Sequence, residues 1–151
     1  MMKIKADRRA TVTLRYAGEH DTATEIFRDA VRVYTPGAVI TIGDMDAAHS
    51  AQRVWRDAAA ALPKIFPSGD AAPGYMLDPG SMVWVSVALA GRITGRDVQG
   101  KTPLHSPSGC GELRVRVGPL VVIMDDRAAA ESQIKVWTAA YDLAWKVFRG
   151  L

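Results

Sequence analysis

VITIGDMDAAHSAQRVW, residues 39–55, is followed 82 positions later by VVIMDDRAAAESQIKVW, residues 121–137. The two stretches share 7 of 17 residues, whereas composition alone gives about one or two identities. The match continues upstream at the same offset, where VRVYTPG aligns with LRVRVGP. We interpret this echo as a degenerate internal repeat, in which one structural unit occurs twice.

Each copy has the same expected layout. We expect a strand at the start of each unit, ATVTLRYAG (10–18) in the first and MVWVSVALAG (82–91) in the second. Apolar residues alternate in the first segment, whereas the second is apolar on both faces. Each unit closes with a helix whose apolar residues recur three and four positions apart, ending at Pro63 in the first copy and at Gly150 in the second. The sequence therefore predicts an α+β fold of two pseudo-repeats, each an antiparallel sheet of three or four strands followed by one helix packed on the sheet.

The repeat also predicts the division of the chain. Residues 1–62 form the first sheet-plus-helix unit, residues 63–81 form a linker, and residues 82–151 form the second unit, within one compact domain overall. The linker contains four prolines and three glycines, which prevent long regular structure. Residues 99–112, QGKTPLHSPSGCGE, are predicted to form a long irregular loop in the second unit.

Composition limits the classes of protein to consider. The chain has 151 residues, a formal charge of +3 and one cysteine, Cys110, so an internal disulfide is excluded. No apolar stretch has the roughly 18 to 20 residues of a membrane span, and the N-terminus lacks the apolar core of a signal peptide. We therefore expect a cytoplasmic protein. The 13 arginines against 6 lysines, with abundant alanine, favour a GC-rich bacterial or phage source.

Arginine and aromatic side chains provide the main functional signal. Alternation in the predicted strands projects them from the face of the sheet opposite the apolar residues, and this set is Arg15, Arg32, Tyr34, Trp84, Arg114 and Arg116. Guanidinium groups bind phosphates and exposed rings stack on bases, which favours single-stranded nucleic acid as the partner. The competing interpretation is an ordinary solvated sheet face, with Trp84 buried.

Other cations lie near predicted strand ends, where they would extend a groove that follows a nucleic-acid backbone. They are Arg8, Arg9, Arg28, Arg92, Arg96 and Lys101. The tandem plan of strands followed by one helix, repeated about a pseudo-twofold axis, resembles that of the Whirly and PUR-repeat single-strand binders. No motif of those families matches positions in this sequence, so the resemblance implies an architecture and assigns no functional residue.

Two chemical alternatives were weighed against structural explanations. Cys110, five residues after His105, suggests a nucleophilic pair, but no surrounding signature or orienting third group supports catalysis. Four acids at strand-to-helix junctions suggest a divalent metal site, while N-capping of the helices explains Asp44 and Asp126 without a metal. These acids are Asp44, Asp46, Asp125 and Asp126. We assign no catalytic residue, no metal ligand and no cofactor, and we expect a protein that is not an enzyme.

Two functional classes remain. The first is a non-enzymatic binding module that contacts nucleic acid, more specifically a single strand, through its arginine and aromatic sheet face. The second is a protein-interaction module, such as an inhibitor, adaptor or assembly factor, which acts through the loops at 63–81 and 99–112. An unpaired sheet edge would also allow a homodimer.

Overall fold

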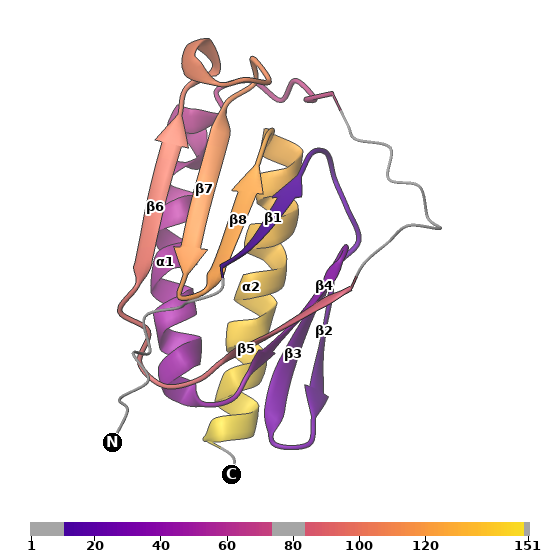
Figure 1. The fold of residues 1–151 in the computed structure, drawn as a ribbon, viewed down its shortest axis with the longest axis vertical. Helices are drawn as coiled ribbons and strands as arrows, with labels where there is room; N and C mark the ends of the chain where they lie inside the picture. The colour runs from indigo at the N-terminus through magenta and orange to yellow at the C-terminus, as the bar shows by residue number, and fades with distance from the viewer. Residues whose placement is uncertain (1–10, 74–83, 150–151) are drawn as a thin grey trace, which may run out of the picture.

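The computed structural model describes residues 11–73 and 84–149, which form two four-stranded sheets and two long helices (Figure 1). The elements of the first half are β1 (Val12–Tyr16), β2 (Ala23–Phe27), β3 (Ala30–Thr35), β4 (Ala38–Ile42) and α1 (Met45–Ile65). Those of the second half are β5 (Val85–Leu89), β6 (Arg96–Lys101), the 3₁₀ turn η2 (Pro103–His105), β7 (Glu112–Val117), β8 (Leu120–Met124) and α2 (Arg127–Phe148). The predicted α+β class and its two pseudo-repeats are confirmed.

Two predicted boundaries are wrong. The strand β6 extends to Lys101, three residues into the range predicted as an irregular loop, because Val98 pairs with Val115 and covers α1. Gly100 makes this possible, since a Cβ there would lie 2.2 Å from the Ile65 side chain. Helix α1 continues through Pro63 to Ile65, and the Phe66 amide closes the last turn on the Leu62 carbonyl at 2.8 Å. Burial of Ile65 and Phe66 favours this extra turn.

The two halves exchange their first strands. β1 pairs in parallel with β8, so the second sheet has the order β1-β8-β7-β6, and β5 pairs in parallel with β4, so the first sheet has the order β2-β3-β4-β5. The other pairs are antiparallel, as expected. Helix α1 packs mainly on β6 and β7, and α2 packs mainly on β2 and β3 (Figure 1). Each sheet therefore needs both halves of the chain.

The helix caps hold the exchanged strands in place. Asp44 and Asp126 are the N-caps of α1 and α2, as predicted, and their carboxylates accept hydrogen bonds from the helical amides of Ala47 and Ala129. The same carboxylates also accept the amide that follows the exchanged strand of the other half. For Asp44 this amide is that of Gly91, at 2.7 Å, and for Asp126 it is that of Gly18, at 2.9 Å. One residue type thus caps a helix and fastens a strand end in each half.

A pair of serines repeats this connection one turn further along the helices. Ser50 Oγ accepts from the Ile93 amide at 3.0 Å, and Ser132 Oγ accepts from the His20 amide at 3.3 Å. The loops after β5 and after β1 are therefore held against the N-terminal turns of α1 and α2. The loop after β5 carries Arg92.

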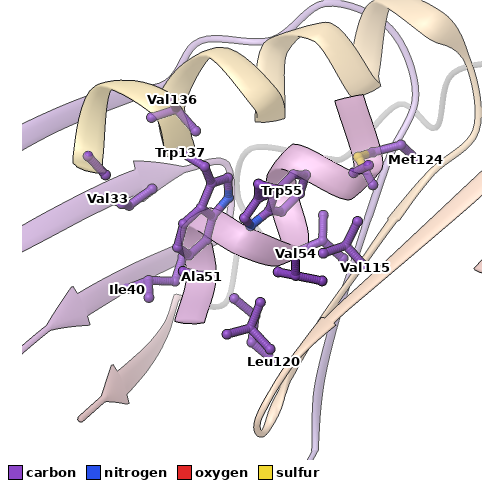
Figure 2. Packing of buried hydrophobic residues seen from close by; sticks show 14 of the residues in the cluster. Val33, Ile40, Ala51, Val54, Trp55, Val115, Leu120, Met124, Val136 and Trp137 are labelled. Carbon is purple, nitrogen blue, oxygen red and sulfur yellow. The ribbon is translucent and has the colours of Figure 1, made fainter. Parts of the chain in front are cut away.

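The core is centred on the contact between the two helices. Trp55 and Trp137, which occupy equivalent positions in the repeat, stack with ring centroids 5.4 Å apart and 13° between their planes (Figure 2). Each is only 3% exposed. Small residues on the buried faces, such as Ala51 and Ala140, let the helices approach closely. The stacked pair marks the pseudo-twofold axis that the sequence echo implies.

We predict that Asp126→Ala destabilises the protein more than Asp44→Ala. Asp126 is 1% exposed and accepts from three backbone amides, those of Gly18, Ala72 and Ala129, whereas Asp44 accepts from two. A lost cap costs about 1 kcal/mol, and each orphaned buried amide adds about 1 to 3 kcal/mol. Urea denaturation should give a loss of roughly 3 kcal/mol or more for Asp126→Ala. Asp57→Ala, at an exposed position, serves as the control. An equal loss of stability in Asp126→Ala and Asp44→Ala would contradict the larger role of Asp126.

Candidate nucleic-acid interface

The six residues predicted as a binding face divide between the two sheets. Arg15 on β1 and Arg114 and Arg116 on β7 lie on the outer face of the second sheet, opposite the helices. Arg32 and Tyr34 on β3 lie on the outer face of the first sheet. Trp84 directly precedes β5 in that same sheet. Arg8 and Arg9, together with residues 74–83, lie outside the described residues.

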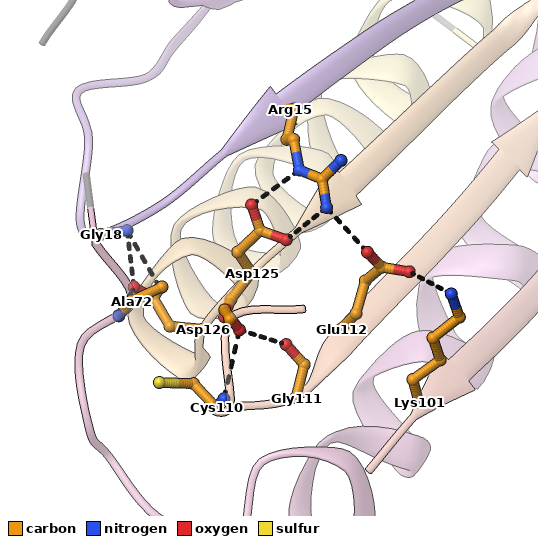
Figure 3. Close-up of polar contacts among 10 residues, drawn as sticks. Arg15, Gly18, Ala72, Lys101, Cys110, Gly111, Glu112, Asp125 and Asp126 are labelled. Carbon is orange, nitrogen blue, oxygen red and sulfur yellow. Dashed lines mark hydrogen bonds and ion pairs between the residues drawn. The ribbon is translucent and has the colours of Figure 1, made fainter. Parts of the chain in front are cut away.

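Arg15 belongs to an ion-pair network (Figure 3). Its guanidinium contacts both carboxylate oxygens of Asp125, at 2.8 and 3.0 Å, and Glu112 Oε1 at 2.8 Å. Asp125 and Glu112 are 4% and 5% exposed, and Lys101 Nζ lies 3.7 Å from Glu112. Two buried carboxylates therefore depend on Arg15 for compensation, and the side chain ties β1 to β7 and β8.

Arg32 and Tyr34 are engaged on the first sheet. The Arg32 guanidinium lies 3.6 Å from the Phe27 ring centroid and 3.9 Å from Glu25, to which the Tyr34 hydroxyl also donates a hydrogen bond. Trp84 is 58% exposed, so the buried alternative is wrong. Trp84 and Tyr34 line a shallow hollow of about 350 Å³. Aromatic surface is thus accessible on this sheet, while its arginine is already stacked.

Another recess lies between α1 and the edge strand β6. This arginine groove, as we name it, has a volume of about 690 Å³ and is lined by Arg53, Arg56 and Arg96, with Asp57 and Asp97 beside them. Arg53 and Arg56 are one helical turn apart on α1, and Arg96 begins β6. Among the described residues, none of these three arginines forms an ion pair. Three arginines therefore line one recess without a carboxylate partner in the described part of the chain.

A second hollow continues the arginine groove toward the N-terminal end of α1. It has a volume of about 380 Å³ and shares Arg53 and Arg96 with the groove. Its other lining residues are Asp46, His49, Ser50 and Arg92. The bonds from Gly91 to Asp44 and from Ile93 to Ser50 hold the loop after β5 at this place, which brings Arg92 beside α1.

Arg114 and Arg116 flank β6 from the other side of the sheet. Both side chains are exposed on β7, where Arg116 pairs in register with Asp97 and Arg114 with Gln99. A Cβ added at Gly95 would lie 4.0 Å from Arg116 Nη2, so this guanidinium reaches the start of β6. β6 is the edge strand of its sheet. Arginines consequently lie on both sides of one open edge.

The sequence analysis identified Arg92 and Arg96 as candidate binding residues, but it did not predict that they lie beside Arg53 and Arg56. The periodicity of α1 places Arg53 and Arg56 on its polar face, and Arg92 and Arg96 were recognised only as cations near a strand end. Arg92 and Arg96 lie near Arg53 because the loop after β5 is held against α1. This position of the loop depends in turn on strand exchange. The only local signal was the pair of arginines three residues apart on the polar helix face.

The structure also places the Cys110–His105 pair and the acids at the strand-to-helix junctions. Cys110 donates its backbone amide to Ser108 Oγ at 3.1 Å, and no hydrogen bond joins its thiol to His105 within the described residues. Capping by Asp44 and Asp126 is confirmed, and Asp125 pairs with Arg15. Among residues 11–73 and 84–149, no group of three or more His, Cys, Asp or Glu side chains is placed to hold a metal ion.

No protein-family model, curated protein or solved structure matches this chain. Within the described part of the chain, neither helix is long and apolar enough to cross a membrane.

We predict that Arg15 and Arg114 differ sharply in their contribution to stability. Arg15→Met leaves two buried carboxylates without their main partner. Because the Arg15 side chain is 38% exposed, solvent screens these ion pairs, and we expect the free energy of unfolding to fall by about 2 to 4 kcal/mol. Arg114→Met removes an exposed side chain and should change the free energy of unfolding by less than about 0.5 kcal/mol. Urea denaturation of both variants tests this, and similar stability of the two would refute the bracing role of Arg15.

Proposed function

We propose that the protein is a non-enzymatic binding module for nucleic acid, with single strands as its preferred form. The observation that carries this proposal is the arginine groove, in which Arg53, Arg56 and Arg96 face one recess without an ion pair. Guanidinium groups donate paired hydrogen bonds that match phosphate oxygens. Arg114 and Arg116, on the far side of β6, extend the cationic surface around the sheet edge.

The acids in the arginine groove favour a single strand over a duplex. Asp57 and Asp97 line the groove together with the arginines. Carboxylates accept hydrogen bonds from exocyclic amino groups such as that of cytosine, and these groups are free on the unpaired bases of a single strand. A recess that offers donors to phosphates and acceptors to base edges suits a strand whose bases are accessible. The exposed Trp84 and Tyr34 would add a stacking surface on the other sheet.

Charge reversal in the arginine groove should weaken binding and its salt dependence. For Arg53→Glu with Arg96→Glu, the slope of log affinity against log salt concentration should fall by about two, one for each lost phosphate contact. The measurement is fluorescence anisotropy of labelled single-stranded and duplex oligonucleotides at several salt concentrations.

A matched control reverses two exposed cations on the other helix, Lys135→Glu with Lys146→Glu. It makes the same change in net charge, so only a groove-specific effect separates the two variants. An equal loss in both would assign binding to overall charge, and no binding by the unmodified protein at low salt would refute the proposal.

One observation favours the second candidate, a protein-interaction module. Leu104, in the turn η2 of the loop at 99–112, is 88% exposed. The loop around it is firmly held, because Ser106 Oγ accepts from the Gly111 amide at 2.9 Å and Ser108 Oγ donates to the Asp125 carbonyl at 3.1 Å. A rigid loop that presents a leucine side chain can bind a protein partner with little loss of entropy.

On this alternative, Leu104→Ser should abolish capture of a protein partner while it leaves the melting temperature unchanged, because the side chain buries almost no surface. Affinity purification of unmodified and Leu104→Ser protein, followed by mass spectrometry, provides the comparison. The charge-reversed groove variant should still capture that partner. Any protein retained equally by both forms counts against the loop as the binding surface.

A further inference from the structure

We propose that the hollow at the end of the arginine groove, lined by Arg53, Arg92 and Arg96, is a subsite for the terminal phosphate monoester of a nucleic-acid strand. This inference rests on the proposed function and deepens it, because it gives the module a preference for strand ends. Its ligand chemistry is a phosphate group with one ester bond, as at a phosphorylated 5′ or 3′ terminus.

The hollow adjoins the arginine groove at the N-terminal end of α1. Arg53 and Arg96 line both spaces, so a strand that occupies the groove leads directly into the hollow. The loop after β5 then lies across the N-terminal turns of α1, where the Gly91 and Ile93 amides bond to Asp44 and Ser50. These bonds hold Arg92 beside Arg53 and Arg96 in the lining of the hollow.

The charge of the hollow matches a monoester better than a diester. Three arginines and one aspartate, Asp46, line the hollow, so its lining has a formal excess of two positive charges. A terminal phosphate carries about −1.5 to −2 at neutral pH and three free oxygens, whereas an internal phosphodiester carries a single negative charge. Among the described residues, Arg53, Arg92 and Arg96 form no ion pair that would compete for the phosphate.

The internal repeat provides a comparison within the same molecule. The equivalent loop of the other half is held in the same way, by Asp126 and Ser132. In that half, Glu19 stands where Arg92 stands, and Glu131 stands where His49 stands. The equivalent of Arg53 is Lys135. The fold therefore forms this corner with an acidic residue in place of Arg92, so Arg92 is not required to build it.

The test compares strands of one sequence that differ only at their ends. Labelled single-stranded oligonucleotides carry a 5′-phosphate, a 3′-phosphate or hydroxyl groups at both ends, and the anisotropy titration gives the ratio of their dissociation constants. Charge-assisted hydrogen bonds to the added phosphate should make at least one phosphorylated strand bind about tenfold more tightly.

The variant Arg92→Ala should reduce this ratio to about one or two, because Arg92 lines the hollow but not the arginine groove. Lys135→Ala, in the other half of the repeat, is the matched control and should keep the full ratio. Circular dichroism checks that both variants are folded, as expected for exposed side chains.

The possible results separate the two proposals. Tight binding of all strands with a ratio near one overturns the terminal-phosphate subsite and leaves nucleic-acid binding standing. A preference that persists in Arg92→Ala also overturns this location of the subsite. Failure of every strand to bind at low salt overturns the proposed function together with this inference.

Discussion

Exchange of the first strand between the two halves is the constraint on which the rest of the structure depends. β1 completes the sheet of β6, β7 and β8, and β5 completes the sheet of β2, β3 and β4. Each exchanged strand is held at its start by a backbone bond, from Val12 to Pro119 at 2.7 Å and from Val85 to Gly37 at 2.9 Å. Its end is held by a capping aspartate. Because every sheet combines both halves, neither half buries its apolar surface alone.

In the core, the two copies of the repeat pack alike but differ in their buried hydrogen bonds. Beside α2, the Gln133 amide donates to Thr35 Oγ1 of β3 at 2.8 Å and its oxygen accepts from Trp137 Nε1 at 3.2 Å. The repeat equivalents of Gln133 and Thr35 are Ala51 on α1 and Val117 on β7, and Trp55 Nε1 has no partner among the described residues. A buried indole N–H without an acceptor costs stability. The tryptophan stack is thus retained in both halves, although only one half satisfies its hydrogen bond.

Local patterns in the sequence predicted what depends on local physics. The constant offset of 82 identified β3, β4 and α1 with their counterparts, and the capping aspartates followed from their place before each helix. Strand exchange was not predictable, because alternation shows which face a strand buries but not which strand it pairs with. Alternation therefore predicted correctly that Arg114 is exposed. It could not predict the ion pairs of Arg15, because these depend on which strand lies beside β1. The Arg15 partners Glu112 and Asp125 are 97 and 110 residues away in sequence.

The two halves are nearly alike where the fold needs them to be and differ where it does not. Both capping aspartates, both serines that hold the loops and both stacked tryptophans are identical between the copies. On the surface beside these residues, Arg92 faces outward in one copy and Glu19 in the other. A requirement of folding would act on both copies, because both make the same corner with the same hydrogen bonds. The clustering of Arg53, Arg92 and Arg96 is therefore not explained by folding alone, and a cationic recess at an open sheet edge suits the anionic partner that we propose.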